Sequence, residues 1–205
     1  IGKMMFEAGI DFLKKLSAHN SHAYVSINVS VSQLLQPDLA ETFIGIVRQS
    51  GVDARRVCLE VTESAKIEPK SPARASIKQL KSAGFKLAID DFGTGYASLG
   101  HLQSLPFDVL KIDRQFVASL DQPAATYSKR QSLLAALLPD LRVEKVTKTD
   151  SMCSALIAMA KACDMLVVAE GIETNTQAEM LRQLGCQMGQ GYLWSRPVPL
   201  ETFLK

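Results

Sequence analysis

The feature that most constrains the fold of this chain is a regular alternation of short apolar runs with longer segments of helical periodicity. Most of the runs are apolar throughout and rich in β-branched residues, which is typical of parallel strands covered on both faces. We predict strands at Tyr24–Val29, Val57–Val61, Phe85–Ile89, Val109–Ile112, Leu166–Ala169 and Gly191–Trp194. Helices are predicted at Ile1–Ala18, Pro37–Ser50, Pro72–Ala83, Ser151–Cys163 and Thr176–Leu184, with stops at Gly51, Gly84 and Gly185. This pattern indicates a parallel α/β fold, either an open sheet or a barrel.

Length and composition indicate a globular protein with one core. The 205 residues suffice for one domain and are too few for two ordinary ones. The net charge of +2 gives no electrostatic argument for binding a DNA or RNA polymer, so a small anionic ligand would need a local site. No apolar run approaches the roughly 20 residues that span a bilayer. The four cysteines show no C-x-x-C spacing, and we interpret them as reduced thiols in a reducing compartment.

Polar residues follow nearly every apolar run at the point where the predicted strand ends. These residues are Asn28, Glu60, Asp90, Asp91, Lys111 and Glu170. Burying an ionised group alone is costly, so a charge at each strand end is not expected by chance. In a parallel barrel these ends converge at the carboxyl-terminal rim, where the carboxylates face one another. Because like charges gathered so closely require a cation, we predict a functional site at this rim.

The donor atoms at these strand ends indicate the kind of cation. The candidate ligands that precede Lys111 offer only amide and carboxylate oxygens, and the three histidines lie outside the strand ends. Such a set suits magnesium, manganese or calcium better than zinc. Carboxylate-rich sites with two neighbouring metals commonly serve phosphoryl chemistry. In this interpretation Lys111 lies near a phosphate oxygen or the attacking water, and Glu170 accepts a proton from that water or completes the metal shell.

Six blocks of residues around the strand ends carry a resemblance to a known family. In chain order they are Asn28-Val-Ser30 with Gln33-Leu34, Leu59-Glu60-Val-Thr-Glu63-Ser64, Ile89-Asp90-Asp91-Phe92-Gly93-Thr94-Gly95-Tyr96-Ala97-Ser98-Leu99, Leu110-Lys111-Ile112-Asp113, Val168-Ala169-Glu170-Gly171-Ile172-Glu173-Thr174 and Gln190-Gly191-Tyr192-Leu193. Their identity and order resemble the EAL domain family of cyclic di-GMP phosphodiesterases along the whole chain. The resemblance implies a TIM-like (β/α) barrel and one domain over residues 1–205.

The resemblance also implies a reaction and a set of site residues. The reaction is metal-dependent hydrolysis of cyclic di-GMP to linear pGpG, with Mg²⁺ or Mn²⁺ and two ions expected per site. The implied metal ligands are Asn28, Glu60 and Asp90, with Asp91 on the second metal. The implied catalytic pair, which positions and deprotonates the attacking water, is Lys111 and Glu170. Glu63 resembles the residue that braces the loop after Asp90 and Asp91 in the family. Glu173 and Gln190 resemble further active-site residues.

Several of these residues also have plain structural interpretations. Asn28 is suited to cap the helix that follows its strand. Lys111 is suited to pair with Asp108 or Asp113. Glu173 stands near a predicted helix start, where a carboxylate also interacts favourably with the helix dipole. Glycines 93 and 95 permit backbone angles closed to other residues, so that their loop can fold over a ligand.

Two departures from the family's pattern are visible. The Glu-Ala-Leu block, whose glutamate would be a metal ligand, belongs in the family to a strand upstream of the helix that opens this chain. Either this block lies in residues that precede Ile1, which we expect, or the domain is truncated and impaired. The barrel therefore lacks its opening strand or strands here, which would expose sheet edges. The second departure is an insertion at about 122–150, which contains an amphipathic stretch at Ser132–Leu141. Because long loops with structure of their own are often functional, we expect this insertion to modify a homodimer interface.

Three functions remain open at this point. The first is an active cyclic di-GMP phosphodiesterase in bacterial second-messenger signalling, and the retained strand-end residues favour it. The second is a receptor that binds cyclic di-GMP without hydrolysing it, and the third is a catalytically inactive interaction domain. We expect a cytoplasmic domain that is regulated by an upstream sensor or GGDEF-type domain. Missing upstream segments would be able to anchor the full protein to a membrane.

Overall fold

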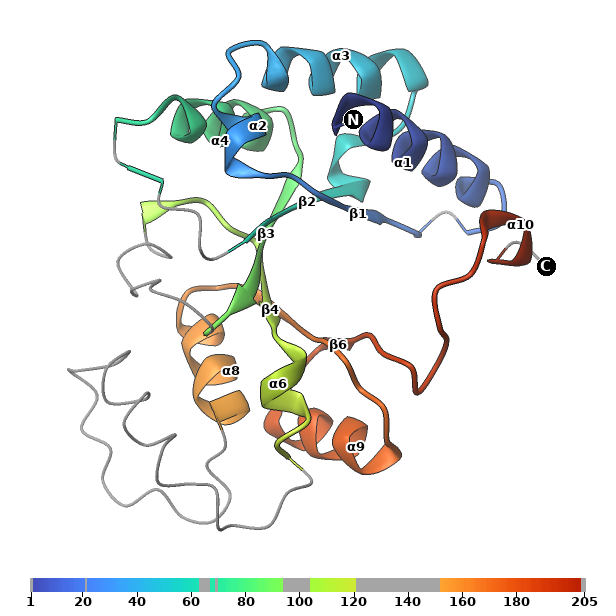
Figure 1. The fold of residues 1–205 in the computed structure, drawn as a ribbon, viewed down its shortest axis with the longest axis vertical. Helices are drawn as coiled ribbons and strands as arrows, with labels where there is room; N and C mark the ends of the chain where they lie inside the picture. The colour runs from blue at the N-terminus through green and yellow to red at the C-terminus, as the bar shows by residue number, and fades with distance from the viewer. Residues whose placement is uncertain are drawn as a thin grey trace. The chain divides into compact units, whose positions relative to one another are not determined.

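The computed structural model describes residues 2–20, 22–62, 67–68, 70–93, 104–120 and 152–203. These residues form two compact units. The first unit comprises Ile1–Asp90, Leu105–Asp108 and Pro197–Lys205, and the second comprises Asp91–Ser104 and Val109–Arg196. Both units contain parallel strands that alternate with helices (Figure 1).

The first unit carries strands β1 (Val25–Asn28), β2 (Val57–Thr62) and β3 (Lys86–Phe92, whose last two residues fall in the second unit). They pair in parallel, β1 with β2 and β2 with β3. Its helices are α1 (Gly2–Ser17), α2 (Val31–Leu34), α3 (Leu39–Ser50), α4 (Pro72–Ser82), α10 (Leu200–Phe203) and the 3-10 turn η1 (Ala54–Arg56). Connections of this kind, with a helix between parallel strands, are βαβ units.

One face of this sheet packs against α1, α3 and α4, which run along the same side of β1 and β2 in Figure 1. The helix residues of this core recur at helical spacing, as Phe6, Ile10 and Leu13 do in α1. Phe6 stacks on Phe43 of α3 with ring centroids 3.8 Å apart. The strand residues of the same core are Ile27, Val57, Leu59, Val61 and Leu87. Because strand side chains alternate between faces, the residues between these point to the opposite face of the sheet.

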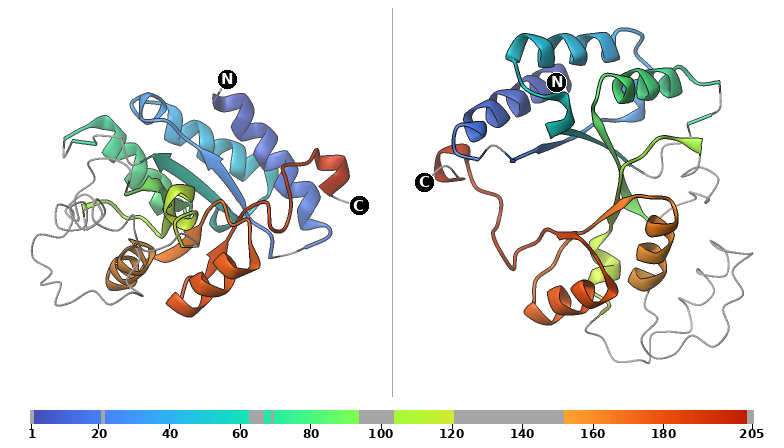
Figure 2. Two further views of the ribbon diagram at one scale, coloured as in Figure 1. Left: turned by 60° about the horizontal axis from the view of Figure 1, so that its bottom comes forward. Right: turned by 180° about the vertical axis from the view of Figure 1, so that it is seen from behind.

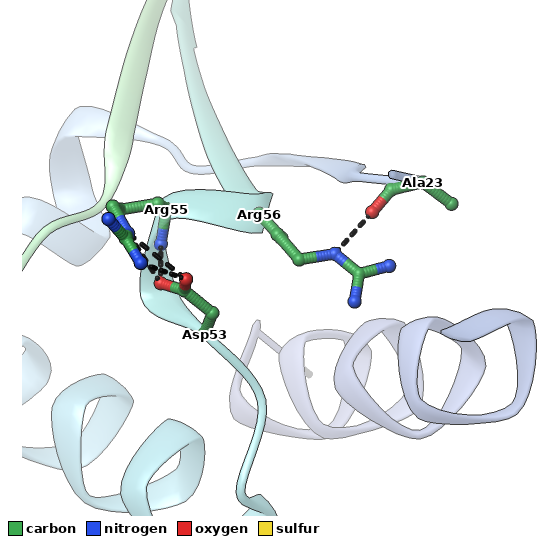
Figure 3. A network of polar contacts seen from close by, with 4 residues as sticks. All are labelled: Ala23, Asp53, Arg55 and Arg56. Atoms are coloured by element: carbon green, nitrogen blue, oxygen red, sulfur yellow. Dashed lines mark hydrogen bonds and ion pairs between the residues drawn. The ribbon is translucent and has the colours of Figure 1, made fainter. Parts of the chain in front are cut away.

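Polar contacts at the start of β2 hold the entry to the first two strands (Figure 3). The Nε of Arg56 donates to the carbonyl oxygen of Ala23 at 2.6 Å, and so ties β2 to the segment that leads into β1. Asp53 accepts from the backbone amide of Arg55 at 2.9 Å and caps η1. The Arg55 guanidinium also pairs with Asp53 and lowers the pKa of that carboxyl to about 2. These contacts lie at the amino ends of the strands.

The second unit carries strands β4 (Val109–Ile112), β5 (Leu166–Ala169) and β6 (Met188–Gly189), paired in parallel in that order. Its helices are α6 (Arg114–Val117), α8 (Met152–Ala162) and α9 (Asn175–Leu184). Figure 2 shows α8 and α9 in orange and orange-red beside these strands, and α8 contacts β4, β5 and α9. The strand residues with no exposed surface are Leu110, Ile112, Val167 and Ala169. They share one face of the sheet, which is the apolar side of this unit.

Five of the six predicted strands are confirmed, with small shifts at their ends. β3 is longer than predicted and includes both Asp90 and Asp91. The sixth prediction, a strand at Gly191–Trp194, is wrong, because this segment is a turn in which Leu193 N donates to Ile172 O at 3.0 Å and Trp194 N donates to Gly191 O at 3.2 Å. The sixth strand lies earlier, at Met188–Gly189. The apolar Tyr-Leu-Trp run resembled a strand, but Tyr192 and Trp194 are 54% and 59% exposed.

The five predicted helices are confirmed, and their ends follow known capping rules. Gly51 and Gly185 adopt the left-handed conformation directly after α3 and α9, with φ of 73° and 85°. The N-cap of α4 is Ser71, followed by Pro72 at the first helical position. The short helices α2, α6 and α10 were not predicted, because their one turn leaves too little periodicity to recognise.

The cysteines are buried or partly buried, as expected of core thiols. Cys58 and Cys153 are buried, and Cys163 and Cys186 are partly buried. Burial raises the pKa of the Cys186 thiol, which keeps it protonated and unreactive. Among the described helices, none combines the length and the apolar character needed to cross a membrane.

The prediction of a single domain over residues 1–205 stays a prediction. The expected insertion at about 122–150, with its amphipathic stretch, lies outside the described residues, as do Glu63 and Gly95.

Candidate functional site

Three of the predicted metal ligands share one face of the first unit's sheet. The register pairs Asn28 of β1 with Glu60 of β2, and it pairs Thr62 of β2 with Asp90 of β3. Residues paired across parallel strands point to the same face, as do residues two apart along one strand. Asn28, Glu60 and Asp90 therefore project from the face opposite the helix-covered core.

These three residues differ in how far they are removed from water. Glu60 and Asp90 are buried, at 7% and 8% exposure, whereas Asn28 is exposed. The backbone continues the pairing beyond β1, because Val29 N donates to Glu60 O at 2.8 Å. Two carboxylates with so little access to water need a positive charge or hydrogen-bond donors nearby.

Asn28 does not cap the helix that follows it, so that structural interpretation is wrong. The N-cap of α2 is Ser30, whose hydroxyl accepts from Gln33 N at 3.3 Å. The side chain of Gln33 accepts in return from Ser30 N at 2.9 Å, which completes a capping box. The amide of Asn28 is therefore not used for this cap.

The strand end at Asp91 has an unusual backbone. Asp91 has a φ of 55°, one of two positive values among the described non-glycine residues. Such a conformation costs about 1–3 kcal/mol and persists where the surroundings impose it, often at functional sites. Gly93 follows with a φ of 96°, and a Cβ there would lie 2.9 Å from the Phe116 ring. The expectation of a glycine-specific conformation is confirmed at Gly93.

The second unit brings Lys111, Glu170 and Gln190 into direct contact. Lys111 Nζ lies 2.6 Å from Glu170 Oε1, and Gln190 Nε2 donates to the same oxygen at 2.9 Å. The register explains this contact, because Lys111 pairs with Val168 and Val168 pairs with Met188. Glu170 and Gln190 each stand two residues beyond these partners and so point to the same face as Lys111.

The ion pair of Lys111 and Glu170 is well shielded from water, with side-chain exposures of 6% and 17%. Asp108 pairs with Lys81 and Lys86, and Asp113 caps α6 by accepting from Gln115 N at 2.8 Å. Both aspartates that offered Lys111 a plain structural partner thus have roles of their own. The shielded contact of Lys111 in this unit is its ion pair with Glu170.

An acidic pair in the second unit fits a hard divalent cation. Asp91 and Glu170 each offer a carboxylate oxygen, and these oxygens lie within 4.8 Å of each other. Two oxygens that ligate one Mg²⁺ ion at about 2 Å lie at most about 4 Å apart, so at the limit of 4.8 Å a small side-chain adjustment brings both oxygens onto one ion. Asp90 directly precedes Asp91 on β3 and adds a further carboxylate to this strand end. The donor set contains oxygen atoms only, in agreement with the predicted metal type.

Two predicted site residues of the second unit, Glu173 and Gln190, are exposed and also form backbone contacts. Glu173 is exposed and directly precedes Thr174, the N-cap of α9, and its backbone amide donates to Gln177 Oε1 at 2.8 Å. Gln190 is exposed, and its backbone accepts from Ile172 N at 3.1 Å. The position of Glu63 lies outside the described residues.

Gln177 was missed in the sequence. It is one of the buried polar residues, at 6% exposure, and its side chain bonds to the connection between β5 and α9. The signal was present, because Thr174-x-x-Gln177 is a capping-box pattern.

Comparison with protein families gives one matching description, the EAL domain, over residues 1–146 and 137–197. Among curated proteins, the chain is 38% identical over 184 residues to the cyclic di-GMP phosphodiesterase NbdA of Pseudomonas aeruginosa, covering 88% of this chain and 21% of NbdA. It is 33% identical over 203 residues to the probable cyclic di-GMP phosphodiesterase PdeB of Escherichia coli, covering 99% of this chain and 33% of PdeB. The chain thus spans a third or less of these relatives.

Solved structures give the same picture of the fold. The phosphodiesterase PaMucR in complex with c-di-GMP superposes with a TM-score of 0.79 at 28% identity, covering 98% of this chain and 73% of that one. The EAL domain of Mycobacterium smegmatis DcpA gives 0.76 at 33% identity, covering 98% and 79%. BlrP1 of Klebsiella pneumoniae, in a complex with manganese and cy-diGMP, gives 0.71 at 25% identity, covering 95% and 45%. The predicted TIM-like α/β fold is thereby confirmed.

Proposed function

Because this chain belongs to the EAL domain family, we propose that it hydrolyses one phosphodiester bond of cyclic di-GMP and releases linear pGpG. The observation that carries the proposal is the contact of Lys111, Glu170 and Gln190 at the strand ends of the second unit, with a carboxylate oxygen of Asp91 within 4.8 Å. Relatives named cyclic di-GMP phosphodiesterases match most of the chain, and a structural relative was solved with this nucleotide.

The proposed ligands of the metal ions, Mg²⁺ or Mn²⁺ with two per site, are Asn28, Glu60, Asp90 and Asp91. Their oxygen donors fit such ions, and BlrP1 was solved with calcium and with manganese. Bound metal would supply charge neutralisation at the phosphate and a lowered pKa of the attacking water.

The protein's own groups account for the proton transfer. Glu170 accepts the proton of the attacking water, while the water oxygen bonds to phosphorus and one P–O bond of the ring breaks. Lys111 and Gln190 both donate to Glu170 Oε1, and so hold the carboxylate in one orientation. Lys111 also provides positive charge for the phosphate oxygens, on which negative charge increases during the reaction. The proposed role of Glu63, Glu173 and Gln190 is to contact the substrate or to brace the loops around the site.

The direct test is to incubate the full-length protein with cyclic di-GMP and either metal, and to separate the products by chromatography. The proposal predicts pGpG with Mg²⁺ or Mn²⁺ and none after chelation. The alternative is a receptor that binds the nucleotide without hydrolysing it. Saturable binding in calorimetry with no pGpG under any metal condition would support the receptor and exclude the enzyme.

The proposal extends to assembly and regulation. We propose a homodimer modified by the segment at 122–150, and control by an upstream sensor or GGDEF-type domain. MucR of Pseudomonas aeruginosa, 32% identical over 180 residues, is named a bifunctional diguanylate cyclase/cyclic di-GMP phosphodiesterase. Sedimentation of the full-length protein tests the dimer.

A further inference from the structure

Gln177, in the first turn of α9, makes more backbone contacts than a capping box requires. In such a box the glutamine side chain accepts only from the N–H of the N-cap residue. Here Gln177 Oε1 accepts from the N-cap, Thr174, at 3.2 Å and also from the preceding residue, Glu173, at 2.8 Å. The side chain is 6% exposed, so both bonds are shielded from water.

The equivalent glutamine of the first unit shows the difference. Gln33, in the capping box of α2, accepts from the N-cap residue Ser30, and the amide of the preceding Val29 donates instead to Glu60 O. Gln33 is only half-buried, whereas Gln177 is buried. The additional bond to Glu173 is therefore not a consequence of helix capping alone.

The connection from Glu170 to Thr174 is held at almost every residue. Glu170 N donates to Ile112 O of β4 at 3.0 Å, and Ile172 N donates to Gln190 O at 3.1 Å. Gln177 then holds the last two amides of the connection. The carboxylates of Glu170 and Glu173 are carried by this same connection, so its geometry sets where they lie.

We propose that Gln177 is a positioning residue for the hydrolysis reaction, fixing the backbone of Glu173 and with it the connection that carries Glu170. This inference rests on the proposed function. Gln177 itself contacts no reacting atom. Small displacements of a catalytic group lower the reaction rate strongly. A shielded hydrogen bond that fixes this backbone is therefore expected to raise kcat.

Thr174 provides the variant that separates positioning from helix stability. Its Oγ1 accepts from Gln177 N at 3.1 Å, which is the other half of the capping box. Thr174→Ala removes this cap but leaves in place both bonds to Gln177 Oε1. Gln177→Met removes both bonds to Oε1 at nearly constant side-chain volume and keeps the bond from its backbone amide to Thr174. Gln177→Glu keeps an acceptor oxygen at this position. Gln183→Ala is the matched control. Gln183 is an exposed glutamine of α9, and among the described residues its side-chain amide donates to the Glu179 side chain.

The experiment measures kcat and KM for cyclic di-GMP, together with the unfolding midpoint, in the full-length protein and these variants. We expect Gln177→Met to lower kcat at least about tenfold and to leave KM within about twofold. Gln177→Glu should retain kcat within about threefold, because the acceptor is restored. Thr174→Ala should lower the unfolding midpoint and leave kcat within about twofold. Gln183→Ala should change neither quantity.

Equal losses of kcat in Gln177→Met and Thr174→Ala, in step with their unfolding midpoints, would overturn the inference, as would a failed rescue by Gln177→Glu. Should Gln177→Met not fold, Gln177→Asn takes its place, since the shorter amide stays polar but does not reach the Glu173 amide. A wild-type protein that releases no pGpG overturns the proposed function together with this inference. An active wild type with an equally active Gln177→Met overturns this inference alone.

Discussion

Glu170 receives two donors on one carboxylate oxygen, and this contact makes it the residue on which the proposed chemistry depends. Lys111 and Gln190 fix the carboxylate, and Lys111 also stabilises its ionised form. A base held in this way keeps one orientation toward the water that it deprotonates. Replacing the carboxylate by an amide retains its shape but removes its ability to accept the proton.

We therefore expect Glu170→Gln to lower kcat by about 10²–10⁴ while cyclic di-GMP still binds. Product chromatography and calorimetry measure the two quantities separately. Glu179→Gln is the matched control, because Glu179 is an exposed carboxylate on α9 that pairs with Arg182. Hydrolysis by Glu170→Gln at the native rate would exclude Glu170 as the base.

Asp108 shows how a charged residue serves the fold instead of the site. Burial opposes its ionisation, but hydrogen bonds from Lys81 and from the amide of Leu87, with the nearby charge of Lys86, hold its pKa below the ordinary value. A carboxyl whose pKa is lowered by folding stabilises the native state above its unfolded pKa, and this contribution is lost as the pH falls through the folded value.

Asp108→Asn should accordingly lower the free energy of unfolding at pH 7 by about 1–3 kcal/mol, because charge-assisted hydrogen bonds are lost. The difference in the free energy of unfolding between wild type and variant should shrink as the pH falls below about 4, the pKa of an aspartate in the unfolded chain, toward the lower pKa of folded Asp108. Urea titrations at several pH values measure the free energy of unfolding of both proteins. A difference that grows on acidification would contradict the assignment.

At the scale of elements, the turn after β6 decides where Gln190 lies. A Cβ on Gly191 would lie 2.1 Å from Ile172 O and 2.3 Å from Ile172 N. Backbone atoms of a buried residue cannot move aside cheaply, and Ile172 is 2% exposed. Only glycine allows this approach, and the approach places Gln190 beside Glu170.

Gly191→Ala should therefore displace the turn and lower both the unfolding midpoint and kcat, by about tenfold or more for kcat. Gly45→Ala is the matched control, since Gly45 lies within α3 and a Cβ there meets nothing within 4 Å. That control should stabilise the protein by about 0.5–1 kcal/mol, because alanine favours helix. An active Gly191→Ala with an unchanged midpoint would show that the turn tolerates a side chain.

At the scale of the whole molecule, the proposed function requires bound metal ions. Mn²⁺ should then raise the unfolding midpoint of the wild-type protein, because an ion that binds the native state stabilises it. Glu60→Gln in the first unit and Asp91→Asn in the second should each remove most of that rise, while Asp53→Asn, at an exposed pair, should not. A full rise in either ligand variant would contradict the assignment of that residue as a metal ligand.

The segment at 122–150 gives a second prediction at this scale. If it modifies a homodimer interface, its deletion should change the mass in solution measured by light scattering, or the activity of the full-length protein. Unchanged mass with unchanged activity would rule out both roles.

Local sequence patterns were enough to predict the parallel α/β class, five of the six strands, the five longer helices and the polar residues at the strand ends. These follow from local causes: apolar runs, helical spacing and capping residues act over a few neighbours along the chain. The capping box of Thr174 and Gln177 was readable in the same way and was missed.

Which of these residues come into contact depends on long-range packing. The contact of Lys111 with Glu170 joins positions 59 residues apart, and it depends on the register of β4, β5 and β6, which no local pattern encodes. The turn at Gly191 likewise depends on the backbone of Ile172, so a Tyr-Leu-Trp run that has the composition of a strand does not form one. Local sequence sets which elements form, whereas packing between distant segments sets their register and hence the chemistry at their ends.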